Sequence, residues 1–310
     1  MIESHSRAVV IVPTLVLLAG LLAVAPTAAF ETDNWPSFRG ADALAVADDD
    51  ERLPTTWSTT ENVAWKVPID GLGWSSPVIW GDRVFITTVA SDGEIEEPRM
   101  GLYFPYGSPE SGGIPTKEGQ LKERDRDVHR WIVYALDFES GEVFWKTEVN
   151  AEAPTFDRHL KNSYASETPV TDGKRVYAFF GNVGVFALDM DGKLVWEKRI
   201  EPATTRLGWG TAASPVLYDD QIFVVSDNDD QSFVMALNTE TGEENWRVNR
   251  EEGSNWATPF VWDNGQRVEL ITAGSDMVRT YDLEGNELWY FTGMNTLSIP
   301  QPFSAHGLLY

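Results

Sequence analysis

The sequence predicts an all-β fold built from repeated four-stranded antiparallel sheets, and three observations support this. A short motif recurs: an apolar pair, then Asp or Asn, then a glycine, and a tryptophan four residues after that glycine. A proline preceded by Ser, Thr or Gln also recurs, mostly about every 44 residues. The 25 glycines and 17 prolines of the 310-residue chain suit many short strands joined by turns. The motif copies end at Trp145, Trp196, Trp246 and Trp289, and the prolines are Pro77, Pro169, Pro215, Pro259 and Pro302.

Each repeat divides into four strands in the same order. An apolar stretch follows the proline, and a turn then leads into a second β-rich run, such as Arg175–Phe179. A third strand carries the apolar pair and its Asp or Asn, and a fourth carries the tryptophan. Asp-Gly and Thr-Gly between runs of alternating hydrophobicity are typical of hairpin turns.

A single sheet of this size cannot bury both of its faces, so successive sheets are expected to pack around a common axis as the blades of a β-propeller. We predict four full blades and the start of a fifth near Ser298. The segment 62–69 resembles an outer strand, because Trp65 matches Trp196, and we expect it to complete the last blade of the intact ring. The four full blades cover 72–150, 162–201, 208–252 and 255–293.

Three segments lie outside the repeats. Residues 1–29 read as a signal peptide: Arg7 precedes an apolar run, and small residues end at Ala29. An uncleaved membrane anchor is the alternative, and either reading predicts a periplasmic or secreted protein. Residues 30–60 are expected to form an extended lead-in, and an insertion at about 90–127 interrupts the partial propeller at 61–310.

Composition excludes several function classes. The net charge of −24 disfavours nucleic-acid binding, because the surface repels phosphate. The chain has no cysteine, so it forms no disulfide and offers no thiolate ligand or nucleophile. Its four histidines lack metal-ligand spacing, and no phosphate-binding loop or nucleophile elbow is present. The sequence therefore nominates no catalytic residue and no metal ligand.

The repeated motif resembles the tryptophan-docking repeat of the PQQ-like (pyrroloquinoline-quinone-like) propellers. That family includes PQQ-dependent quinoprotein dehydrogenases and non-catalytic, BamB-like outer-membrane assembly lipoproteins. The opening segment Asn34–Gly40 looks like the lead-in of exported bacterial members. The resemblance implies roughly seven or eight blades in the intact protein, so we expect the chain to be truncated at its C-terminus.

Two sets of aromatic residues follow from the repeats. The motif tryptophans are expected to dock on the hairpin turn of the neighbouring blade, each indole N–H bonding a carbonyl there. A second set precedes the prolines, at the entry to the innermost strand, and is the candidate ligand site at the mouth of the central channel. The docking set is Trp145, Trp196, Trp246 and Trp289; the mouth set is Trp74, Tyr164, Trp209 and Trp256.

The sequence leaves three functional hypotheses open. The first is an exported, non-catalytic scaffold that binds a protein or peptide and needs no cofactor. The second is a quinoprotein dehydrogenase that oxidises an alcohol or a sugar with PQQ and calcium, although the cysteine pair that many such enzymes place against the quinone is absent. The third, a weaker alternative, is a carbohydrate-binding propeller that uses the mouth tryptophans.

Overall fold

The computed structural model describes residues 34–47, 49–93, 127–156, 158, 159 and 161–310. The predicted signal peptide and nearly all of the predicted insertion lie outside these residues. No helix in the part of the chain that the structure describes is long and apolar enough to cross a bilayer.

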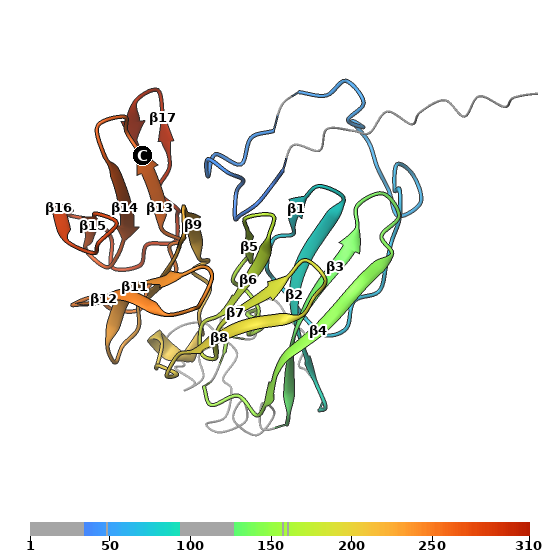
Figure 1. The fold of residues 1–310 in the computed structure, drawn as a ribbon, viewed down its shortest axis with the longest axis horizontal. Coiled ribbons are helices and arrows are strands. Elements are labelled where there is room, and N and C mark those ends of the chain that lie inside the picture. Colours follow the sequence, from blue (N-terminus) through green and yellow to red (C-terminus); the bar gives the residue numbers. More distant parts are fainter. Residues whose placement is uncertain (1–33, 48, 94–126, 157, 160) are drawn as a thin grey trace, which may run out of the picture. The chain divides into compact units, whose positions relative to one another are not determined.

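Four antiparallel sheets of four strands each follow one another along the chain (Figure 1). The predicted all-β fold of four-stranded blades is therefore confirmed. Blade one contains β1 (Val78–Trp80), β2 (Arg83–Ser91), β3 (His129–Asp137) and β4 (Val143–Glu152). Blade two contains β5 (Val170–Thr171), β6 (Arg175–Phe180), β7 (Gly184–Asp189) and β8 (Leu194–Arg199).

Blades three and four repeat this arrangement, and a two-stranded hairpin follows them. Blade three contains β9 (Val216–Tyr218), β10 (Gln221–Ser226), β11 (Ser232–Asn238) and β12 (Glu244–Arg250). Blade four contains β13 (Phe260–Asp263), β14 (Val268–Ala273), β15 (Met277–Tyr281) and β16 (Glu287–Thr292). The hairpin of β17 (Ser304–Ala305) and β18 (Leu308–Leu309) is where the fifth blade is predicted to start.

The order of strands within each sheet follows the chain. The first strand begins just after the repeat proline, and the fourth carries the motif tryptophan. The pairing of the third and fourth strands shifts register at the apolar pair of every motif, as between Ala187 and Leu188. Such a bulge bends the outer strand and increases its twist.

Alternation along the second strand of a blade explains why neighbouring sheets pack together. In β6, Val176 and Phe180 face blade one, whereas Tyr177 and Phe179 face blade three. Because side chains of a strand point to opposite faces in turn, one apolar strand supplies two separate cores. All four side chains are at most 2% exposed, so the inter-blade layers form the hydrophobic core of the protein.

The segment 62–69, predicted as an outer strand, lies in no strand of the structure. Val67 and Ile69 instead cover the face of blade one that is turned away from blade two. No neighbouring strand among the described residues offers this segment a ladder of hydrogen bonds, so it is held by side-chain packing.

The predicted lead-in contains tight turns between residues 37 and 44. Trp35 pairs with Ile79 of β1, and the carbonyl of Pro36 accepts a 3.0 Å hydrogen bond from the amide of Thr171 in β5. Ala43 is 4% exposed and belongs to the core cluster of Phe260 in β13. The lead-in therefore contacts the innermost strands of blades one, two and four.

Candidate functional site

Three of the motif tryptophans, and Trp65 with them, bridge one blade to the next hairpin turn. The Nε1 atom of each donates a hydrogen bond to a backbone carbonyl in the third-to-fourth strand turn of the following blade. The pairs are Trp65 with Phe138 at 2.9 Å, Trp145 with Met190 at 2.8 Å, Trp196 with Thr239 at 2.9 Å, and Trp246 with Leu283 at 2.7 Å.

The motif glycine makes room for the indole of the preceding blade. Gly192 has a φ of +82°, and a Cβ atom there would lie 2.5 Å from the ring of Trp145. Gly242 stands in the same relation to Trp196, with a φ of +72° and a distance of 2.5 Å. Only glycine satisfies both the left-handed backbone and the close ring. One ring face and the N–H of these indoles are thus already engaged within the fold.

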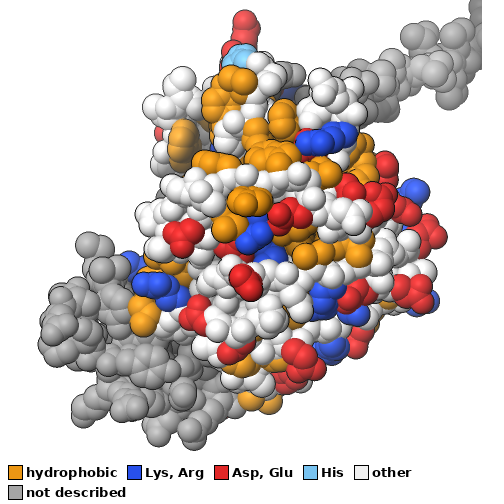
Figure 2. Space-filling model, turned by 90° about the vertical axis from the view of Figure 1, so that its left-hand side faces the viewer, with side chains coloured by type: hydrophobic (Ala, Val, Ile, Leu, Met, Phe, Trp, Pro, Cys, Tyr) orange, Lys and Arg blue, Asp and Glu red, His pale blue; other side chains and the backbone are white. Residues whose placement is uncertain are grey.

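Trp289 differs from the other motif tryptophans. Its Nε1 donates a 2.6 Å hydrogen bond to Oε2 of Glu269, a residue of its own blade. The described residues contain no further third-to-fourth strand turn for it to reach. The same strand leaves Tyr290 and Phe291 58% and 52% exposed. Figure 2, which faces the side where Figure 1 labels β16, shows hydrophobic side chains gathered among charged ones.

The Asp or Asn of each motif closes its hairpin. Oδ1 of Asp189 accepts hydrogen bonds from the amides of Asp191 and Lys193 at 3.0 and 2.9 Å. Oδ1 of Asn238 accepts from Glu240 and Thr241 at 2.9 and 3.0 Å in the corresponding turn. These side chains replace backbone partners in the turn, as is typical of Asx turns.

Three of the four predicted mouth aromatics line one groove, which we call the mouth groove. Trp74 enters from the segment before blade one, Trp209 from the segment before blade three, and Trp256 from the segment before blade four. The groove has a volume of about 590 Å³, within the range of ligand sites. Its lining is Phe38, Trp74, His159, Lys161, Asn162, Ser166, Thr168, Trp209, Ala212, Ser214, Trp256, Thr258, Leu297 and Ile299.

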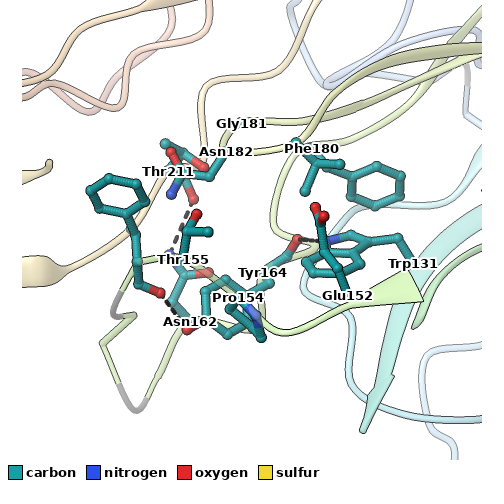
Figure 3. Close-up of a pocket in the computed structure, with 13 residues that line it drawn as sticks. Trp131, Glu152, Pro154, Thr155, Asn162, Tyr164, Phe180, Gly181, Asn182 and Thr211 are labelled. Carbon is teal, nitrogen blue, oxygen red and sulfur yellow. Dashed lines mark hydrogen bonds between the residues drawn. The ribbon is translucent and has the colours of Figure 1, made fainter. Parts of the chain in front are cut away.

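Tyr164, the fourth predicted mouth aromatic, lies elsewhere. Figure 3 shows it beside Trp131, in a small pocket of about 20 Å³. Its backbone is left-handed, with a φ of 58°, and its hydroxyl donates a 2.6 Å hydrogen bond to the carbonyl of Phe156. Tyr164 stands five residues before its proline, whereas Trp74 and Trp256 stand three before theirs. The left-handed turn directs its ring into this pocket rather than into the groove.

Distance from the proline, rather than aromatic character, identifies the residues of the groove that sequence reasoning missed. Ser166 and Ala212 occupy the position of Trp74 and Trp256, three residues before a proline. Because these two side chains are small, blades two and three leave the groove open. Thr168, Ser214 and Thr258, each directly before a proline, line the groove as well.

The walls of the groove are aromatic and partly open. The rings of Trp209 and Trp256 pack with centroids 5.8 Å apart, and Nε1 of Trp256 donates a 2.7 Å hydrogen bond to the carbonyl of Gly210. His159 meets Trp209 edge-on at 5.9 Å. Burial lowers the pKa of His159, so its imidazole is neutral at pH 7. Trp74 remains 49% exposed, which leaves its ring accessible to a ligand.

Phe38 of the lead-in also lines the mouth groove. Its neighbours Pro36, Ser37 and Ala43 line a second hollow, of about 500 Å³, that includes Thr171, Tyr218 and Asp263 from the far ends of the innermost strands. One short segment of the lead-in therefore borders both hollows.

Hydrogen bonds from backbone amides to side-chain hydroxyls link the blades at the groove. The residues that form these links are Ser76, which contributes its amide, and Thr168, Ser214 and Thr258, and we call them the hydroxyl belt. The amide of Ser76 donates to Oγ1 of Thr168 at 3.0 Å. The amide of Thr168 donates to Oγ of Ser214 at 2.9 Å, and the amide of Ser214 to Oγ1 of Thr258 at 3.0 Å. Each link joins one blade to the next at the residue before the proline.

The groove carries little charge. Lys161 lies at its exposed rim, and no Asp or Glu is among its lining residues, although the chain has 48 acidic residues. In the described portion of the chain, no three His, Asp or Glu side chains lie close enough together to hold a metal ion. The groove thus combines apolar walls with neutral hydroxyls at its base.

Comparisons with known proteins agree with this architecture. The quinohemoprotein alcohol dehydrogenase of Comamonas testosteroni matches 91% of this chain with a TM-score of 0.56 and 14% identity, which shows a shared propeller fold. The match takes in 45% of that enzyme, so the chain spans less than half of its length. BamB of Moraxella catarrhalis matches 79% of this chain and 71% of its own, at 13% identity and a TM-score of 0.44. No curated protein matches.

A family model described as "Outer membrane protein assembly factor BamB" matches residues 129–298, which is more than half of the 310-residue chain. This match covers the repeats that carry the docking tryptophans. The chain belongs to the BamB-type family of PQQ-like repeat β-propellers.

Proposed function

We propose that this protein is a non-enzymatic scaffold whose mouth groove binds a segment of a partner polypeptide. One observation carries the proposal: indoles from three separate blade entries converge on one groove with Leu297 and Ile299. Tryptophans with open ring faces are enriched among the residues that dominate protein–protein binding energy. The family description, an outer membrane protein assembly factor, fits a scaffold that handles other polypeptides.

The proposed location is outside the cytoplasm, in the periplasm or beyond it. The apolar run after Arg7 supports export, with either a cleaved signal peptide or a retained membrane anchor. The net charge of −24 supports a polypeptide rather than a nucleic acid as partner.

The alternative of a PQQ- and calcium-dependent dehydrogenase fits the mouth groove poorly. Calcium takes six to eight oxygen ligands, usually with several carboxylates, and the groove is lined by no Asp or Glu. The carbohydrate alternative is also weakly supported, because the amide of Asn162 already bonds within the protein.

A peptide-binding experiment tests the proposal. A library of N-acetylated hexapeptides is screened against the protein, and the dissociation constants of the hits are measured by calorimetry. Trp74→Ala and Trp256→Ala should each weaken binding at least tenfold, because each removes an apolar wall of the groove. Tyr290→Ala, on the exposed outer strand, is the matched control and should leave binding unchanged.

Two results would contradict the scaffold proposal. One is a set of hits whose affinity is the same for wild type, Trp74→Ala and Trp256→Ala. The other is dye reduction with alcohols or sugars after the protein is incubated with PQQ and Ca²⁺, which would favour the dehydrogenase.

A further inference from the structure

The base of the mouth groove presents hydrogen-bond donors that the protein does not use. Thr168, Ser214 and Thr258 are 1%, 3% and 3% exposed, and all three line the groove. Each hydroxyl oxygen accepts a backbone N–H from the preceding blade. None of the three hydroxyls donates a hydrogen bond to a described residue. A hydroxyl carries one hydrogen to donate, so three buried donors remain for a ligand.

The other polar groups at the base already bond within the protein. Nδ2 of Asn162 donates to the carbonyls of Trp209 and Thr211 at 2.9 and 3.1 Å. Oδ1 of Asn162 accepts from the amide of Ser163 at 2.7 Å and from the hydroxyl of Ser166 at 2.6 Å. The unused hydrogen-bonding capacity is therefore on the three hydroxyls, each of which keeps its hydrogen and one lone pair of its oxygen.

A ligand group that accepts hydrogen bonds can use the three hydroxyl hydrogens. An ionised carboxylate has two oxygens and no hydrogen to donate. It meets no Asp or Glu side chain in the groove, and Lys161 at the rim attracts it.

The end of an apolar polypeptide can use both the indoles and the hydroxyls of the groove. Phe38 lines the groove together with the three buried hydroxyl residues and the half-exposed ring of Trp74. A C-terminus can bring its carboxylate to the base while its last apolar side chains lie against the indoles. We propose that the mouth groove binds the apolar C-terminus of a partner polypeptide, with its free carboxylate on the hydroxyls of Thr168, Ser214 and Thr258. This inference rests on the proposed polypeptide-binding function of the groove.

The test compares matched peptides. The best apolar hexapeptides from the library are made as free acids, as C-terminal amides, and as amides that carry one internal Glu. Dissociation constants are measured by calorimetry at pH 7. The free acids should bind at least tenfold more tightly than the amides, because only they place acceptor oxygens on the belt.

Variants of the belt test whether its hydroxyls cause the preference for free acids over amides. Thr258→Val removes one donor and should reduce the acid-to-amide ratio at least threefold, whereas Thr258→Ser keeps the hydroxyl and should retain the ratio. Since Thr258→Val also removes the acceptor of the Ser214 amide, its melting curve is compared with that of Thr258→Ser. Lys161→Gln at the exposed rim leaves the belt intact and should lower the ratio by less than Thr258→Val does. If Thr258→Val fails to fold, the comparison of acids and amides on the wild-type protein still decides the inference.

The outcomes separate this inference from the function on which it rests. If acids and amides bind equally tightly and both depend on Trp74 and Trp256, the proposed carboxylate recognition is overturned. The groove would then still be a polypeptide-binding site. If amides with an internal Glu bind as tightly as the free acids, the group that the hydroxyls bind is an acidic side chain rather than a chain end. If no peptide, in any of the three forms, binds in a way that depends on Trp74 or Trp256, both proposals are overturned.

Discussion

The outer tryptophans and the mouth tryptophans use the same side chain in two different ways. Trp145, Trp196 and Trp246 each give their N–H to a carbonyl of the next blade and cover a glycine there. Trp74 lies at the other end of the blades, 49% exposed and opposite no such glycine. An indole that is fully engaged stabilises the fold, and one with an open face is available to a ligand.

The difference arises from what surrounds each set. At the outer rim, a left-handed glycine lets a ring approach the backbone of the next blade, so each blade fixes its neighbour. At the mouth, serine, threonine and alanine occupy the equivalent inner positions, and the blades are linked by hydroxyls instead. Packing therefore holds the blades together at one end, and polar links leave a hollow at the other.

Removing one tryptophan from each set should give the largest contrast in stability. Trp196 is 9% exposed and Trp74 is 49% exposed. Trp196→Ala should lower the free energy of unfolding by about 3–5 kcal/mol, through a lost core ring and an unpaired carbonyl. Trp74→Ala should lower it by less than about 1 kcal/mol. Urea unfolding followed by circular dichroism measures both; equal losses would contradict the division.

Two glycines with similar backbones separate the contribution of the ring contact from backbone strain. Gly242 has a φ of +72° and lies under Trp196, whereas Gly265 has a φ of +76° and no atom within 4 Å of its added Cβ. Gly265→Ala should cost about 1 kcal/mol of backbone strain. Gly242→Ala should cost about 2–4 kcal/mol, because the displaced indole adds to that strain. If thermal denaturation showed the same loss of stability for both variants, contact with the indole would not be the reason that a glycine is required at Gly242.

A buried carboxyl at the mouth end provides a test based on pH. Glu167 is 1% exposed, and its Oε1 accepts a 3.2 Å hydrogen bond from the amide of Gly181. Burial raises its pKa from 4.5 to about 7. The folded protein thus holds a proton that the unfolded chain has released above pH 4.5, so this group's contribution to stability falls as pH rises from 4.5 to about 7.

Glu167→Gln removes this titration and leaves an oxygen that can still accept from Gly181. We expect the variant to be more stable than wild type at pH 8, by about 3 kcal/mol, with the gain shrinking toward pH 4.5. Chemical denaturation at several pH values measures the difference. A gain that is constant with pH would show that Glu167 does not titrate in this range.

The sequence predicted what depends on short, repeated spacing. The distance of four residues from Gly192 to Trp196 recurs in each blade, so the blades and the strand that carries each tryptophan could be placed without coordinates. Tyr164 escaped this reasoning because a single left-handed residue redirects its side chain. Segment 62–69 was predicted to complete the last blade of the intact ring, and the strands of that blade are not among the described residues, so this pairing stays a prediction.

The base of the mouth groove could be found only with the structure. Ser166 and Thr258 are ordinary residues in the sequence, and their role depends on inter-blade distances that no local pattern encodes. Phe38 lies far along the chain from the tryptophans above it and reaches the groove through turns of the lead-in. The fixed distance from each repeat proline marks these residues in the sequence, but only the structure shows that they meet in one groove.

The most direct test of the division between the two sets is fluorine NMR of the protein labelled with 5-fluorotryptophan at all 13 tryptophans. Resonances are assigned by single substitutions and followed while a hexapeptide acid that binds the protein is added. The account predicts that the signals of Trp74, Trp209 and Trp256 shift and that those of Trp145, Trp196 and Trp246 stay in place. Shifts confined to the outer set, with the mouth set unmoved, would contradict it.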